Sequence, residues 1–184
     1  FNRISIDGDT STNDMVIVLA SGKSPLNLAN TTTARQFAAA LESVCASLAE
    51  QIVRDAEGLR HFVRLHIQGA RSETEAERIA ATIATSPLVK TAWAGADPNW
   101  GRILAAIGRC GIAVDVSKVD IRFGMMPVCC NGVQVPFDED AAYQYLSQPD
   151  IDIHITLNSG KSSFIYLTCD LTTDYVRINA DYRT

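Results

Sequence analysis

The stretch TTTARQFAAALESVCASLAEQIVRD, residues 31–55, carries the longest helical pattern in the chain. Its apolar residues recur at steps of three and four, which places them on one face of a helix. Alanine fills much of the remainder and allows close packing against a sheet. We predict an amphipathic helix that ends before Gly58. Its apolar stripe consists of Phe37, Leu41, Val44, Leu48 and Ile52.

The segment before this helix predicts a hairpin. Residues 1–6 and 15–19 are rich in apolar side chains and are expected to form two strands. Between them, residues 7–14 (DGDTSTND) contain no apolar side chain and many turn formers. A hairpin and one helix are too little to bury the stripe. We therefore expect residues 1–58 to pack against a partner.

The remainder of the chain predicts a mixture of strands and helices. Ser72 and Glu75 have the spacing of a capping box that opens a helix, and Pro87 is expected to end it. Asp97 is expected to cap a further helix, and Asp138 a short one through residue 146. The order of elements predicts the α+β class with a mixed or antiparallel sheet. Strands are expected at residues 62–67, 88–93, 119–128, 133–135, 151–157 and 164–168.

Composition narrows the class of protein. The 184 residues are 47% hydrophobic and 20% charged, with a formal net charge of -5, which is typical of a globular chain with one large or two small domains. This charge disfavours nucleic acid as a partner. No apolar run approaches the roughly 20 residues that span a bilayer, so no membrane partner is expected. No targeting signal opens the chain, and a start at Phe1 inside an expected strand suggests that something precedes it.

The cysteines and histidines form no recognisable motif. The five cysteines include no Cys-x-x-Cys pair, so we expect reduced thiols and no metal site. His61, His66 and His154 lie in no triad or ligand pattern and are expected to be packing or surface residues. The cysteines are Cys45, Cys110, Cys129, Cys130 and Cys169.

Three places leave a functional interpretation open beside a structural one. Residues 7–14 form either a hydrogen-bonded connection or a polar loop lining a site. Residues 97–102 (DPNWGR) form either a capped helix start anchored by Trp100 or a site where free N–H groups hold a carboxylate. The polar and aromatic end of the chain either frays or docks through its apolar residues.

At these places the chain resembles the ornithine acetyltransferase family, also called glutamate N-acetyltransferase. The resemblance rests on FNRI followed by DGDTSTND at residues 1–14, on DAEG at 55–58, on DPNWGRI at 97–103 and on YVRINADYRT at 175–184. The four motifs stand in the family's order, and the last ends the chain where the family's chain ends. One motif alone would be weak evidence, but four in register are specific.

The resemblance implies a self-processing acyltransferase of arginine biosynthesis. Members cut themselves before a threonine, and this new amino-terminal threonine is the nucleophile, with its own α-amino group as the base. It takes acetyl from N-acetylornithine and passes it to glutamate. The nucleophile and the oxyanion hole lie upstream of Phe1, so this chain is expected to contain no catalytic residue and to be inactive alone. No cofactor is implied, and whether acetyl-CoA is also a substrate stays open.

The resemblance also assigns binding residues and partners. Glu57 matches an acidic residue that would receive a substrate ammonium, and Asn179 and Thr184 match contacts in the terminal motif. Ala56 stands where the family usually has glycine, and residues 59–61 also differ, which puts the loop conformation in doubt. The implied partners are the upstream chain, N-acetylornithine and glutamate, in a homo-oligomer of the two-chain unit. The implied location is the cytoplasm, or the mitochondrial matrix in a eukaryote.

The implied architecture has two parts. Residues 1–58 would contribute to an αββα sandwich of the amino-terminal-nucleophile type, completed by the upstream chain. Residues 59–184 would form a smaller mixed α/β domain whose tail returns to the active site. Two other functions stay open: a related self-cleaving aminopeptidase or amidase, and a non-catalytic module that binds amino acids.

Overall fold

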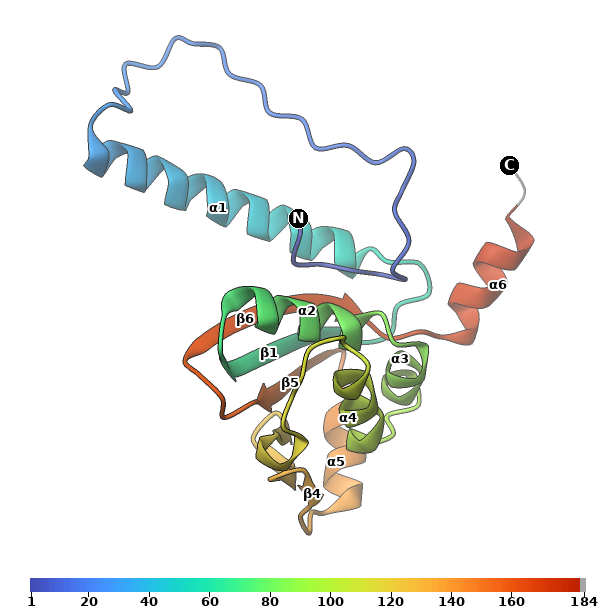
Figure 1. Ribbon diagram of the computed structural model, residues 1–184. Helices are drawn as coiled ribbons and strands as arrows, with labels where there is room; N and C mark the ends of the chain where they lie inside the picture. Colours follow the sequence, from blue (N-terminus) through green and yellow to red (C-terminus); the bar gives the residue numbers. More distant parts are fainter. Residues whose placement is uncertain (183–184) are drawn as a thin grey trace.

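The computed structural model describes residues 1–182 and contains a mixed sheet of six strands (Figure 1). The strand order is β4-β3-β2-β5-β1-β6. β1 and β5 are parallel, whereas every other neighbouring pair is antiparallel. The predicted α+β class with a mixed sheet is confirmed. The strands are β1 (Phe62–Ala70), β2 (Asp120–Phe123), β3 (Met126–Cys130), β4 (Val133–Gln134), β5 (Asp150–Thr156) and β6 (Ser162–Cys169).

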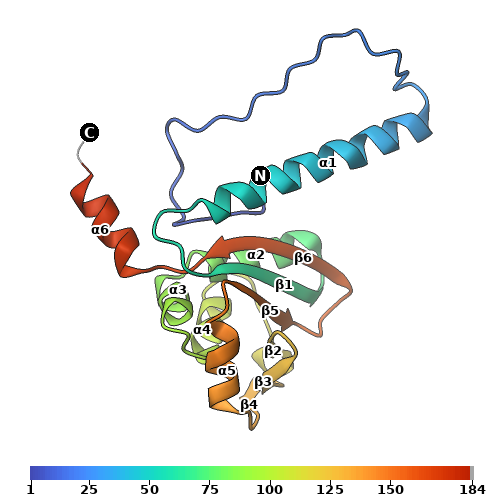
Figure 2. The same cartoon turned by 180° about the vertical axis from the view of Figure 1, so that it is seen from behind.

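Residues 1–182 also contain six α-helices. α2 to α5 lie on one face, where their apolar side chains pack with alternate residues of the strands into the main core. The end of α1 packs on the other face of β1 and β6, in a smaller cluster around Val53, Phe62 and Cys169. Figure 2 shows α1 and α6 outside the body formed by the sheet and the other helices. The helices are α1 (Thr31–Arg54), α2 (Glu73–Ala84), α3 (Pro87–Ala94), α4 (Trp100–Gly108), α5 (Glu139–Leu146) and α6 (Thr173–Asp181), with a short 3-10 turn η1 (Val116–Lys118).

Side-chain caps set the starts of α1, α2, α4 and α5. The Asn30 side chain accepts hydrogen bonds from the backbone N–H groups of the first turn of α1, and Asp138 caps α5 as expected. At α2, Ser72 accepts the N–H of Glu75, as in a capping box. The Glu75 carboxylate, however, accepts the backbone N–H of Arg71 at 2.7 Å, one residue before the cap. α4 is capped by Asn99, so the assignment of this cap to Asp97 was wrong.

Residues 88–93 are helix α3, and their prediction as a strand was wrong. Pro87 occupies the first turn of this new helix, where its missing N–H costs nothing. Val89 and Trp93 are four residues apart, which puts both on the buried face of α3. The single strand predicted at 119–128 is in fact two strands, because Gly124, at φ +56°, turns the chain between β2 and β3.

The predicted N-terminal hairpin is also wrong. Residues 15–19 form no strand with any described residue, and their side chains are 59–91% exposed. Within the part of the chain that the structure describes, residues 1–6 pair only through an isolated bridge, Ile4 beside Leu167, at the free edge of β6. In Figure 1 the chain after this bridge runs as a long open arc to the start of α1.

The apolar stripe of α1 finds no cover within residues 1–182. Phe37, Leu41, Val44, Leu48 and Ile52 are each 40–56% exposed. A run of large apolar side chains on one helix face is usual only where another element packs on it. None of the described helices combines the length and the apolar character needed to cross a membrane.

Candidate functional site

Two of the three predicted site residues meet in the structure. The Asn179 side chain, on α6, donates a hydrogen bond from Nδ2 to Oε2 of Glu57 at 2.7 Å, although the residues are 122 positions apart. Both side chains are exposed to solvent. The third, Thr184, lies outside the described residues.

Glu57 is positioned by the turn that follows α1. Gly58 adopts φ +68°, a left-handed conformation that favours glycine. Its carbonyl oxygen accepts a 2.7 Å hydrogen bond from the Thr172 hydroxyl, just before α6. A Cβ at Gly58 would lie 2.5 Å from the backbone nitrogen of Tyr175, so only glycine lets the turn pass this close to the helix. Ala56, where the resemblance implies glycine, packs against the smaller apolar cluster.

Asn179 is oriented by its own helix. Thr172 caps α6 by accepting the backbone N–H of Tyr175 at 3.2 Å. Asn179 Nδ2 donates a second hydrogen bond to the Tyr175 carbonyl oxygen at 3.1 Å. Both hydrogens of the amide nitrogen are then engaged, which leaves Oδ1 to meet a ligand. A carboxylate and an amide oxygen side by side suit a cation such as an ammonium group.

The polar loop of residues 7–14 reaches the same site. The Tyr175 hydroxyl donates a 2.8 Å hydrogen bond to Asp7 Oδ2. Partial burial, and then the Asp7 carboxylate, raise the pKa of Tyr175 to about 12, so the hydroxyl stays a donor at neutral pH. Asp7 Oδ1 accepts the backbone N–H of Asp9 at 2.8 Å. Residues 7–9 therefore form an acidic loop beside the Glu57 turn.

A buried lysine and aspartate lie behind these segments, and sequence reasoning missed both. Lys90, on α3, is only 2% exposed, and its Nζ donates to Thr168 Oγ1 at 3.2 Å and to the Cys169 carbonyl oxygen. Burial lowers the pKa of Lys90. Asp170 is also buried and accepts the backbone N–H groups of Arg60 and His61 at 3.0 and 3.2 Å. The sequence signal for the buried lysine was its position within the apolar run 88–93, where a charged residue is unusual.

Residues 97–102 match their structural interpretation. Asn99 caps α4, and Asp97 Oδ2 accepts a hydrogen bond from Asn99 Nδ2 at 3.1 Å. Trp100 packs against the main core, and Arg102 donates to the Leu88 carbonyl oxygen at 2.8 Å. These contacts join α3 to α4 and account for the motif by packing and capping.

The histidines and cysteines also take structural positions. The rings of His66 and His154 stack across β1 and β5 with centroids 4.4 Å apart, and His66 Nε2 lies 2.6 Å from Asp152. His61 Nδ1 bonds the Gln148 carbonyl oxygen at 2.7 Å. All five cysteines are free thiols. Within residues 1–182, no three His, Cys, Asp or Glu side chains gather in an arrangement that could hold a metal ion.

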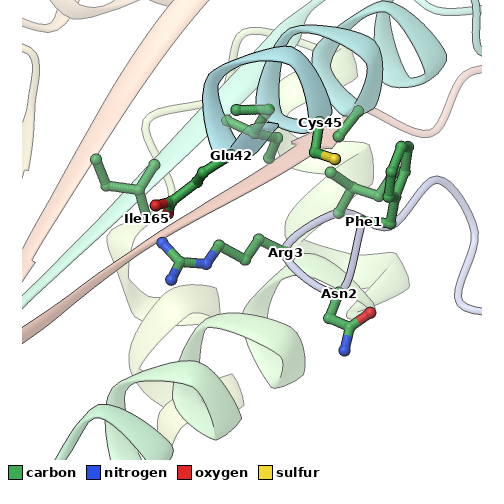
Figure 3. A pocket seen from close by; sticks show the side chains of 10 residues that line it. Phe1, Asn2, Arg3, Glu42, Cys45 and Ile165 are labelled. Atoms are coloured by element: carbon green, nitrogen blue, oxygen red, sulfur yellow. The ribbon is translucent and has the colours of Figure 1, made fainter. Parts of the chain in front are cut away.

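A separate, largely apolar pocket of about 490 Å³ opens between the N-terminal segment, α1 and β6 (Figure 3). Glu42 and Cys45 of α1 lie across it from Arg3 and Phe1, and Ile165 of β6 lines one side. The apolar walls of the pocket suit aliphatic side chains rather than an amino acid's charged groups.

Comparison with known proteins matches residues 1–184 to the model of the ArgJ family. The arginine biosynthesis bifunctional protein ArgJ of Desulfotalea psychrophila is 47% identical over 187 residues, which cover 100% of this chain and 48% of that protein. The glutamate N-acetyltransferase of Methanopyrus kandleri is 46% identical over 187 residues, which cover 100% of this chain and 48% of that protein. The chain thus spans about half the length of the curated relatives it matches.

One solved structure is also similar. The crystal structure of the arginine biosynthesis bifunctional protein ArgJ from Bacillus halodurans matches with a TM-score of 0.91 at 44% sequence identity. The match covers 99% of this chain and 87% of the crystallised chain.

Proposed function

The chain belongs to the ArgJ family, and on this premise we propose that it is the downstream part of an acetyltransferase of arginine biosynthesis. The complete enzyme would move acetyl from N-acetylornithine to glutamate. The observation that carries the proposal is the 2.7 Å contact between Asn179 and Glu57, which joins two sequence motifs at one solvent-open place. The names of the relatives from Desulfotalea psychrophila and Methanopyrus kandleri support the reaction class.

In the proposed reaction, an amino-terminal threonine on the upstream part attacks the acetyl carbonyl of N-acetylornithine. The threonine's α-amino group takes the hydroxyl proton and passes it to the leaving amine, so ornithine departs and an acetyl-threonine ester forms. The neutral amine of glutamate then attacks this ester, and the threonine's α-amino group carries a proton from that amine to the threonine oxygen, so N-acetylglutamate leaves and the hydroxyl is restored. Glu57, Asn179 and Thr184 of this chain would bind the substrate, with Glu57 receiving its ammonium group.

The proposal requires an upstream partner. The chain covers 87% of the crystallised relative and 48% of the protein from Desulfotalea psychrophila. The exposed stripe of α1 offers an apolar face for such a partner. We place residues 1–58 in a shared αββα sandwich and residues 59–184 in a smaller domain. In support, the main core draws its buried side chains only from residues 63–166.

We further propose a homo-oligomer of the two-chain unit, working in the cytoplasm or, in a eukaryote, in the mitochondrial matrix. No cofactor is required by the acetyl-transfer chemistry. The word "bifunctional" in the names of several relatives supports testing acetyl-CoA as a second acetyl donor.

Substitution of Glu57 tests the assignment in the complete enzyme. Glu57→Ala removes a charge-assisted hydrogen bond to the substrate ammonium, so kcat/KM for N-acetylornithine should fall roughly 10- to 100-fold. Glu57→Gln keeps the shape of the side chain but not its charge, so kcat/KM should fall almost as far. Glu139→Ala, at an exposed acidic residue on α5, is the matched control and should leave the kinetics unchanged. Unchanged kinetics in both Glu57 variants would refute the assignment.

Two assays separate the other functions. Glutamate acetylation that depends on N-acetylornithine, measured beside peptide hydrolysis, distinguishes the acetyltransferase from a related aminopeptidase or amidase. Calorimetry of the isolated chain with ornithine and glutamate tests for a binding module that needs no upstream partner. Tight binding by the isolated chain, without acetyl transfer by the complete protein, would favour that module.

A further inference from the structure

Helix α6 has no buried side chain to fix its orientation. Its apolar residues Val176 and Ile178 are 58% and 36% exposed. Figures 1 and 2 show the helix projecting away from the body of the sheet and its helices. Within residues 1–182, its placement over the Glu57 turn therefore depends mainly on polar contacts.

Few polar contacts are available for this purpose. The Thr172 hydroxyl ties the start of α6 to Gly58. The ion pair between Arg60 and Asp174, at 3.3 Å, is solvent exposed and contributes little. The 2.8 Å bond from the hydroxyl of the half-buried Tyr175 to the exposed Asp7 carboxylate joins the helix to a third segment of the chain.

Tyr175 and Asn179 are coupled through the helix. They lie four residues apart, on the same face of α6. The Asn179 amide also donates to the Tyr175 carbonyl oxygen at 3.1 Å. A rotation of α6 that broke the Tyr175–Asp7 bond would carry Asn179 away from Glu57.

Asp7 is itself anchored to the sheet. The residues before it are held on β6 by hydrogen bonds between Ser5 N and the Leu167 carbonyl oxygen at 3.1 Å, and between the Tyr166 hydroxyl and the Ile4 carbonyl oxygen at 3.0 Å. Cys169 Sγ lies 3.8 Å from the Ile6 carbonyl oxygen. The loop of residues 7–14 thus begins at a fixed point, and its first side chain faces α6.

We propose that Asp7 and Tyr175 are positioning residues whose hydrogen bond holds α6 so that Asn179 stays beside Glu57. This inference rests on the proposed function, because it makes the pair responsible for the geometry of the substrate-binding groups. The polar loop of residues 7–14 thereby has a role in positioning α6, which its composition and its turn geometry do not indicate.

Kinetics of the complete enzyme, with the upstream part and residues 1–184 together, test the role. Tyr175→Phe removes only the hydroxyl and should raise KM for N-acetylornithine about 3- to 10-fold, with kcat changed less than twofold. Asp7→Ala should do the same, whereas Asp7→Asn should recover most of the affinity, because its Oδ1 can keep the Asp9 N–H while its Nδ2 donates to the Tyr175 hydroxyl. Tyr143→Phe, at an exposed tyrosine on α5, is the control and should change neither parameter.

A double-mutant cycle separates positioning from a general loss of stability. In an Asn179→Ala background, Tyr175→Phe should cause no further rise in KM, because the side chain that it positions is gone. Effects that multiply in the double variant would overturn the positioning role.

Hydrogen exchange provides a readout independent of the reaction. The backbone amides of α6 should exchange faster in Tyr175→Phe than in the unaltered enzyme or in Tyr143→Phe. Unchanged exchange would overturn the inference. Unchanged kinetics in Glu57→Ala and Asn179→Ala would instead overturn the proposed function, whereas unchanged kinetics only in Tyr175→Phe and Asp7→Ala would overturn the positioning role alone.

Discussion

Gly58 is expected to affect both the free energy of unfolding and the position of α6 at the candidate site. Its φ of +68° and the 2.5 Å approach to the Tyr175 nitrogen leave no room for a side chain. Gly58→Ala should lower the free energy of unfolding by roughly 1–3 kcal/mol and displace α6, because the strain and the clash fall on backbone atoms. Urea denaturation measures the first effect, and hydrogen exchange of α6 measures the second.

Gly108 is the matched control for this substitution. It is the last residue of α4, and an added Cβ would meet nothing within 4 Å. Gly108→Ala should be neutral or stabilising by up to about 1 kcal/mol, since alanine loses less conformational entropy in a helix. If Gly58→Ala lowered the free energy of unfolding no more than Gly108→Ala does, the close approach to Tyr175 would not restrict position 58 to glycine.

At this scale the resemblance to a family, and not the local pattern, predicted Glu57 and Asn179. Nothing about the spacing of two polar residues 122 positions apart indicates that they touch. Lys90 and Asp170 escaped notice because burial of a charged side chain depends on which distant groups surround it. Asp7 was noticed as a turn former, but its partner Tyr175 could not be inferred.

Among the elements, α2 carries a pH-dependent contact. The Arg71 guanidinium, through hydrogen bonds to the carboxylate, lowers the pKa of Glu75 despite the opposing effect of burial. A lowered pKa in the folded state means that the contact stabilises above the unfolded-state pKa of about 4, and that this contribution is lost as the pH falls through the lower folded-state value. Free energies of unfolding measured from pH 7 to pH 3 should therefore decrease more steeply in the unaltered protein than in Glu75→Gln.

An exposed acid on another helix provides the comparison for this measurement. Glu139→Gln should keep the pH dependence of the unaltered protein, because this side chain lies exposed in the first turn of α5. If Glu75→Gln and Glu139→Gln gave the same pH curve as the unaltered protein, the Glu75–Arg71 contact would contribute nothing to acid stability.

Helix α3 shows why element type was predicted unevenly. Residues 88–93 form a short apolar run, which fits a buried strand and a buried helix equally well. Pro87 ends α2 and also suits the first turn of α3, so the same residue supported both interpretations. The longer patterns, 31–55 and 151–157, were predicted correctly because their periods of 3.6 and 2 repeat often enough to be distinguished.

For the whole molecule, the exposed stripe of α1 predicts an interface with the upstream part. Replacing Leu41 and Leu48 together by lysine should weaken the association of the two parts roughly 100-fold or more, because each leucine loses its apolar burial. Association of the co-expressed parts can be followed by size-exclusion chromatography and by titration calorimetry. The two leucines are 40% and 46% exposed here, so the sheet domain should stay folded in the variant.

A leucine on another element controls for added charge. Leu88→Lys places the same side chain at an exposed position of α3, on the other side of the sheet, and should leave association unchanged. Normal association of the Leu41→Lys, Leu48→Lys double variant would show that the stripe does not form the interface.

Features that depend on neighbours within about four residues could be predicted from the order of amino acids alone. These are the amphipathic α1, the capped starts of α2 and α5, the alternation along β5 and the motifs that indicate the family. Caps and periodicity act locally, so they can be recognised without knowledge of the fold.

The folded structure was needed to show which distant segments meet. It set the strand order, placed β1 between β5 and β6, buried Lys90 behind the site, and brought Asp7, Glu57 and α6 together. It also left residues 15–19 without a strand partner among the described residues. The physical reason is that strand pairing and burial minimise the free energy of the whole chain, to which segments far apart in sequence contribute jointly.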